Sequence, residues 1–83
     1  MQVKIYSTPV CPYCNLLKDY LKSKNIVFEE IDVSQDQAAG KEMVAKSGQM
    51  GVPVSIITTG QDKEEVIIGF DKAKINEILN IKE

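Results

Sequence analysis

Two cysteines separated by two residues are the side chains of this chain best suited to chemistry. They lie in the segment Cys11-Pro12-Tyr13-Cys14, and the chain has no other cysteine. In the first turn of a helix, side chains three positions apart have Cβ atoms about 5 to 6 Å apart, within reach of a disulfide after a small adjustment. The spacing therefore predicts a pair of thiols that can pass between dithiol and disulfide.

The two thiols are expected to have unequal roles if a helix begins at this segment. Cys11 then takes the N-cap and Pro12 the first helical position, which suits the fixed φ and missing N–H of proline. The Cys11 sulfur would face the amides of Tyr13 and Cys14 and the positive end of the helix dipole, and all three favour thiolate over thiol. We expect Cys11, exposed at the loop-to-helix corner, to be the nucleophile and the less accessible Cys14 to be the resolving thiol.

Other uses of this cysteine segment remain open. Zinc takes four ligands, and the chain has no histidine, so a zinc site would need carboxylates or a second chain. A metal ion or cluster bridging two chains is another alternative, and two inert buried cysteines are a third. Tyr13 is either a surface aromatic or a wall of a substrate groove. Lys18 either lies on a solvated face or adds positive potential to the site.

The pattern of apolar residues predicts seven elements in the order βαβαββα. Runs rich in β-branched residues indicate strands, and apolar residues three and four positions apart indicate helices. The expected strands are Val3–Tyr6, Ile26–Val33, Val52–Thr58 and Glu64–Ile68, with a turn over Thr59–Lys63. The expected helices are Pro12 to about Lys24, with Leu16, Leu17, Tyr20 and Leu21 on its apolar face, then Ala38–Lys46, then a last helix carrying Ile75, Ile78 and Leu79.

Polar residues and glycines mark where the second and third helices begin and end. The segment Ser34-Gln35-Asp36-Gln37 has the form of a capping box that opens with a serine. Gly48 is suited to end the helix that follows, and Gly40 inside it costs about 1 kcal/mol relative to alanine. Asp71 is a candidate N-cap for the last helix.

Length and composition exclude several classes of protein. A chain of 83 residues predicts a single domain over residues 1–83. A formal net charge of -2, with no arginine and no basic stripe, argues against nucleic acid as a partner. The start of the chain lacks the apolar region of a signal peptide, and no apolar run reaches membrane-spanning length, so we expect a cytoplasmic protein with no membrane contact. In a reducing compartment, two cysteines are more typical of redox or metal chemistry than of a permanent disulfide.

Pro53 stands at the start of the third expected strand. Because proline has no N–H to donate to a neighbouring strand, it must lie at an edge or in a special turn. Only about 5 to 6% of X-Pro bonds in folded proteins are cis, so the residues alone favour a trans Val52-Pro53 bond.

Four segments together resemble the glutaredoxin family of the thioredoxin-fold superfamily. They are Ile5-Tyr6, Cys11-Pro12-Tyr13-Cys14, Gly51-Val52-Pro53 and Gly69-Phe70-Asp71. The Cys-Pro-Tyr-Cys tetrapeptide is specific to that family. The likeness covers nearly the whole chain.

The resemblance implies an α/β protein with a thioredoxin-like, or glutaredoxin, fold: a four-stranded mixed sheet flanked by three helices. It implies a cis Pro53 and a Val52 backbone that pairs with the substrate, in a groove also shaped by Tyr13, Gly69 and Asp71. It further implies exchange with glutathione or with protein disulfides. We expect no bound cofactor, glutathione as a co-substrate, and a monomer.

Departures from the family pattern leave the electron donor open. Thr8 stands where many glutathione-using members carry a basic residue, Gly51 replaces a threonine, and Gly69-Phe70-Asp71-Lys72 is a reduced form of the element that binds the γ-glutamyl end. Gly69-Phe70 instead resembles glutaredoxin-like redoxins that thioredoxin reductase recharges and that supply electrons to ribonucleotide reductase. A dimeric iron-sulfur cluster carrier ligated by glutathione, and a binding module without turnover, are further alternatives.

Overall fold

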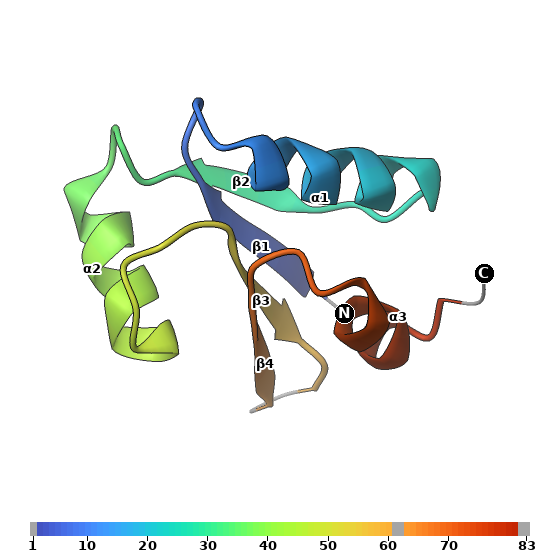
Figure 1. Cartoon of the computed structure of the whole chain (residues 1–83). Helices are drawn as coiled ribbons and strands as arrows, with labels where there is room; N and C mark the ends of the chain where they lie inside the picture. The colour runs from blue at the N-terminus through green and yellow to red at the C-terminus, as the bar shows by residue number, and fades with distance from the viewer. Residues whose placement is uncertain (1, 61–62, 82–83) are drawn as a thin grey trace.

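The computed structural model describes residues 2–60 and 63–81, and Figure 1 shows their arrangement around one sheet. The elements in chain order are β1 (Gln2–Ser7), α1 (Pro12–Ser23), β2 (Glu29–Asp32), α2 (Gln37–Ser47), β3 (Val54–Thr58), β4 (Glu64–Ile68) and α3 (Lys72–Leu79). This is the predicted order of strands and helices. The predicted fold class is confirmed.

The four strands form one mixed sheet in the order β2-β1-β3-β4. β1 pairs in parallel with β2, with Lys4 opposite Glu29, and antiparallel with β3, with Tyr6 opposite Val54. β3 and β4 pair antiparallel as consecutive strands. The last residues of β1 and the first residues of β3 therefore lie side by side at one end of these two central strands, beside the loop that leads into α1.

The sheet separates two hydrophobic clusters, because successive strand residues point to opposite faces. On one face, Val3 and Ile5 of β1 pack with α1 and α3. On the other, Tyr6 of β1 packs with Met43, the one buried residue of α2. Figure 1 shows α2 on the opposite side of the sheet from α1 and α3.

The helix α1 begins at Pro12, as predicted, with Cys11 as its N-cap. Its buried face is narrower than expected. Leu17 and Leu21 are buried, but Leu16 is 50% exposed, so its place on the apolar face was wrong. Leu16 directly precedes a buried residue, and adjacent positions on a helix point about 100° apart.

The second strand is shorter than its apolar sequence suggested. Residues 26 to 28 lie outside it, and β2 begins at Glu29, opposite Lys4. The reason is local: the Ile26 N–H donates to the Leu21 carbonyl at 2.9 Å, so this segment still completes the end of α1. Ile26 and Phe28 pack against the larger cluster without joining the ladder.

The N-cap of α2 is Asp36 and not Ser34, which corrects the predicted capping box. The Asp36 carboxylate accepts the Ala39 N–H at 3.0 Å. Ser34 is instead engaged with the preceding residues, because its own N–H and hydroxyl both donate to Asp32 Oδ1. Gly48 ends the helix with a φ of 76°, as predicted.

The third strand begins at Val54, two residues later than predicted, and the Val52-Pro53 bond before it is cis. The family resemblance predicted this cis bond, whereas base rates alone favoured trans. The predicted turn Thr59–Lys63 includes residues 61 and 62, which lie outside the described residues; the Thr59 N–H donates to the Lys63 carbonyl at 3.0 Å. Within residues 2–60 and 63–81, no helix has the length and apolar composition needed to cross a membrane.

Candidate active site

Cys11 lies at the junction of the β1 loop and the helix α1. Its backbone is extended, with φ -96° and ψ 111°, while the next residue is already helical. Its sulfur accepts the Cys14 N–H at 3.2 Å. Of the two amides expected to face this sulfur, only that of Cys14 makes the hydrogen bond among the described residues. The Cys11 sulfur therefore accepts a backbone N–H at the start of α1.

Cys11 is less exposed than we predicted. Only 9% of its surface is accessible, although it stands at the corner between loop and helix. The cause is the Val52-Pro53 segment, because the Cys11 Sγ lies 3.8 Å from the Val52 carbonyl oxygen.

Cys14 is fully enclosed in the first turn of α1. Its exposed fraction is 0%, as expected for the less accessible thiol. Burial raises the pKa of the Cys14 thiol to about 11, and its hydrogen bond with Cys11 acts in the same direction. Cys14 therefore holds its proton at neutral pH. Both thiols are free in this structure.

The cis proline joins the cysteine loop to the far side of the sheet. Val52 lies beside Cys11, and the carbonyl of Pro53 accepts the Gly69 N–H at 2.9 Å. Gly69 has a φ of 76°, which is a left-handed conformation that favours glycine. Three of the predicted groove residues, Val52, Pro53 and Gly69, are thus connected to Cys11 through contacts.

The remaining two predicted groove residues lie at the margins. Tyr13 is 63% exposed in the first turn of α1, next to both cysteines in sequence. Asp71 caps α3, where its carboxylate accepts the Lys74 N–H at 3.1 Å. One Asp71 oxygen is therefore committed to the helix, as its predicted role as N-cap requires.

Lys18 of α1, Ser7 of β1 and Glu30 of β2 form a polar cluster. Lys18 Nζ is 2.5 Å from Glu30 Oε2, and the buried Ser7 hydroxyl donates to the same oxygen at 3.0 Å. Lys18 lies one turn after Cys14 on the helix and lowers the pKa of that thiol against the larger effect of burial. The positive potential considered for Lys18 is therefore present, and it acts on Cys14.

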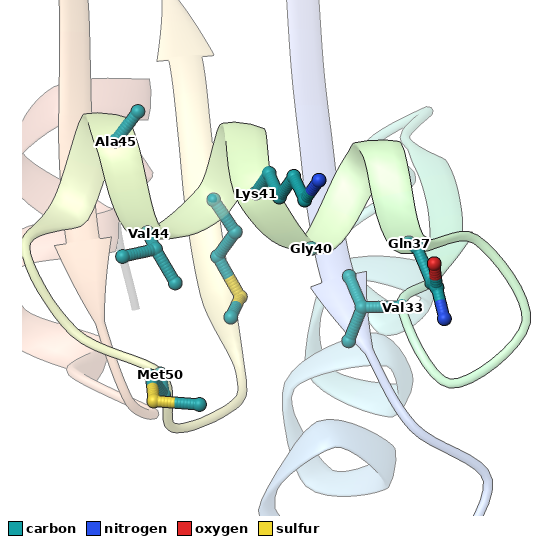
Figure 2. A pocket seen from close by; sticks show the side chains of 8 residues that line it. Val33, Gln37, Gly40, Lys41, Val44, Ala45 and Met50 are labelled. Atoms are coloured by element: carbon teal, nitrogen blue, oxygen red, sulfur yellow. The ribbon is translucent and has the colours of Figure 1, made fainter.

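An open cavity along α2 was not predicted. Its volume is about 660 Å³, and Figure 2 shows it between the helix and the loop that follows. We call it the α2 groove; its lining residues are Val33, Gln37, Gly40, Lys41, Met43, Val44, Ala45 and Met50. Gly40, which costs the helix about 1 kcal/mol relative to alanine, is part of this lining.

Among residues 2–60 and 63–81, no group of three or more histidine, cysteine, aspartate or glutamate side chains is arranged to hold a metal ion. The site that the structure describes therefore consists of two thiols, a cis proline and a surrounding set of backbone groups.

Comparisons with known proteins place this arrangement in a family. The glutaredoxin family model matches residues 3–60. A glutaredoxin-like 8.6 kDa protein from the rubredoxin operon of Clostridium pasteurianum is 46% identical over 77 residues, which cover 93% of this chain and 96% of that one.

Two solved structures show the same architecture over nearly their whole length. A point mutant of the thioredoxin-like protein BC3987 has a TM-score of 0.86 and 32% identity, over 98% of this chain and 97% of that chain. The glutaredoxin-like protein NrdH-redoxin from Escherichia coli has a TM-score of 0.76 and 26% identity, over 93% of each chain. The second of these is described by its thioredoxin-like activity profile.

Proposed function

The chain belongs to the glutaredoxin family of thiol-disulfide oxidoreductases, and on that premise we propose that it reduces disulfides of proteins or of glutathione through Cys11 and Cys14. The observation that carries this proposal is the inequality of the two sulfurs. The Cys11 sulfur receives an amide N–H at the start of a helix, whereas the Cys14 thiol is wholly buried and holds its proton.

In the first step, the Cys11 thiolate attacks one sulfur of the substrate disulfide. A bond forms between Cys11 and that sulfur, and the other substrate sulfur leaves as a thiolate that takes a proton from solvent. In the second step, Cys14 loses its proton and attacks the Cys11 sulfur. The second substrate thiol is released, and a Cys11–Cys14 disulfide remains, so that two electrons and two protons have passed to the substrate.

Substrate is held, in this proposal, by the segment that covers Cys11. Val52 has its carbonyl at the Cys11 sulfur, and a substrate backbone alongside Val52 adds to the protein as an extra strand would. Tyr13 forms an exposed wall beside the thiols, and Gly69 and Asp71 border the far side of Pro53. Glutathione is a co-substrate, and the chemistry requires no resident cofactor.

A second candidate concerns the electron donor. Thioredoxin reductase would recharge the protein, which would then supply electrons to ribonucleotide reductase. The likeness to NrdH-redoxin, described by a thioredoxin-like activity profile, favours this alternative. Thr8 also favours it, because a threonine supplies no charge to a glutathione carboxylate.

Trapping the mixed disulfide tests the roles of the two cysteines. Cys14→Ser should accumulate a covalent adduct with a disulfide substrate, which mass spectrometry detects, because no resolving thiol remains. Cys11→Ser is the matched control and should form no adduct. If Cys11→Ser forms the adduct and Cys14→Ser does not, the roles are reversed and the proposed mechanism is wrong.

A coupled assay separates the two electron donors. NADPH oxidation is followed with a protein disulfide as substrate, in the presence of either glutathione with glutathione reductase or thioredoxin reductase alone. Turnover with thioredoxin reductase alone supports the second candidate, and turnover that requires glutathione supports glutathione as co-substrate. Turnover with neither reductant would contradict the proposed oxidoreductase function.

A further inference from the structure

The α2 groove is large enough to hold a ligand side chain and lies open to solvent. Its volume of about 660 Å³ falls within the range of about 300 to 1,000 Å³ that is typical of ligand sites. Figure 2 shows Val33, Val44 and Met50 around it, with Gln37 toward one end of the helix and Lys41 near its middle. The lining is mostly apolar, which suits an apolar occupant.

Apolar side chains in the wall of the groove are exposed to an unusual degree. Met50 is 82% exposed and Val44 38% exposed, although each would lose contact with water if the groove were filled. Exposed apolar surface of this kind in a cavity is typical of binding sites. The groove therefore has surface that an apolar ligand group would bury.

The wall of the groove is joined through the chain to the segment that covers Cys11. Met50 lies in its wall, and Val52, whose carbonyl meets the Cys11 sulfur, follows two residues later. Two residues of extended chain span at most about 7 Å. A strand paired with Val52 therefore places the side chain two residues away beside Met50.

Gly40 keeps this space open. In Figure 2 it lies on α2 between Val33 and Val44. A Cβ added at Gly40 would lie 3.9 Å from the Val33 Cβ, which is an ordinary contact. A side chain at position 40 is therefore compatible with the fold and would extend into the groove.

We propose that the α2 groove is a subsite for an apolar side chain of a protein substrate, two residues from the cysteine that Cys11 attacks. This inference rests on the proposed function, because it places the substrate strand at Val52. Glutathione has no apolar side chain to offer, and both of its ends are carboxylates. The substrate class that fits is an extended protein segment with an aliphatic or aromatic residue near its reactive disulfide.

Symmetric disulfides of five-residue peptides test the subsite directly. The central residue is cysteine, and leucine is placed two residues before it, two residues after it, or replaced by alanine at both places. The reduced protein is mixed with each peptide disulfide, the reaction is quenched with acid, and the released peptide thiol is measured. We expect one leucine peptide to react about tenfold faster than the alanine peptide, since a few methylene groups in an apolar pocket give this order of discrimination.

Substitutions on α2 assign any such preference to the groove. Gly40→Leu should bring the rate with the preferred leucine peptide down to that with the alanine peptide, and Gly40→Ala should lower it in part. Ala38→Leu is the matched control, because it adds the same side chain at an exposed position of α2 outside the groove. This control should keep the preference, and urea denaturation verifies that all three variants are folded.

The outcomes separate this inference from the proposed function. Equal rates for all peptides, or a leucine preference that survives in Gly40→Leu, would overturn the subsite. An equal loss of rate with glutathione disulfide in Gly40→Leu would also overturn it, because the groove would then serve glutathione. If the wild-type protein reduces neither these peptides nor bis(2-hydroxyethyl) disulfide, it is the oxidoreductase function that fails.

Discussion

The buried thiol of Cys14 should make the stability of the reduced protein depend on pH in the alkaline range. Its pKa is raised from 9.0 to about 11, chiefly by burial. The folded state therefore keeps a proton that the unfolded state loses. The corresponding contribution to stability is complete below pH 9 and is lost as the pH rises from about 9 to 11.

The size of the effect follows from the separation of the two pKa values. Each pKa unit corresponds to about 1.4 kcal/mol, so the folded state should lose about 1 kcal/mol by pH 10 and about 3 kcal/mol above pH 11 through Cys14. Urea denaturation of the reduced protein at pH 8 and pH 10, followed by circular dichroism, measures this loss. Other groups titrate in the same range, so the comparison is with Cys14→Ala.

The variant is expected to lose less stability than the wild-type protein between these two pH values, by about 1 kcal/mol. Its absolute stability at pH 8 does not enter the comparison, because only the change with pH is used. Parallel pH profiles for the two proteins would refute the reasoning. They would mean that Cys14 ionises as readily in the folded protein as in the unfolded chain.

Three further predictions concern stability. Leu17→Ala should cost about 2 to 5 kcal/mol of unfolding free energy, whereas Leu16→Ala, at a half-exposed neighbouring position, should cost far less; similar losses in urea denaturation would contradict the packing described. Asp36→Ala should destabilise the protein by about 1 kcal/mol in thermal unfolding and Ser34→Ala by less, and the reverse order would restore the serine cap. The ion pair with Lys18 lowers the pKa of Glu30, so its contribution to the free energy of unfolding is present above pH 5 and is lost as the pH falls toward 3. Glu30→Gln should reduce this dependence of stability on pH by less than about 1 kcal/mol, as measured by urea denaturation, and an unchanged dependence would argue against the ion pair.

The elements could be predicted because local signals agreed with the final packing. Pro12 after Cys11 predicted both the start of α1 and the N-cap position of Cys11, since proline has a clear preference at the first helical position. Alternating and β-branched residues predicted β4 to the residue, Glu64–Ile68. Errors arose where two local signals competed, as at Ser34 and Asp36, which are both good capping residues.

The surroundings of the site could not be predicted from local signals. The small exposure of Cys11 depends on Val52, which lies 41 residues away in the chain. The α2 groove depends on three separate segments meeting around Gly40, and no pattern within one segment reports that meeting. Such features depend on contacts between distant segments, whereas hydrophobic periodicity predicts the secondary structure and the fold class but not those contacts.

The division of the core by the sheet also has a consequence for how this protein can change over time. α2 contributes one buried residue, Met43, to the smaller cluster, while α1 contributes two, Leu17 and Leu21, to the larger one. Apart from Met43, the side chains of α2 can therefore be replaced without opening either cluster. Met43 and the hydrogen bond that Tyr6 donates to Glu42 attach the helix to the sheet. The outer surface of α2 is thus expected to tolerate substitution while the two cysteines and the sheet keep their arrangement.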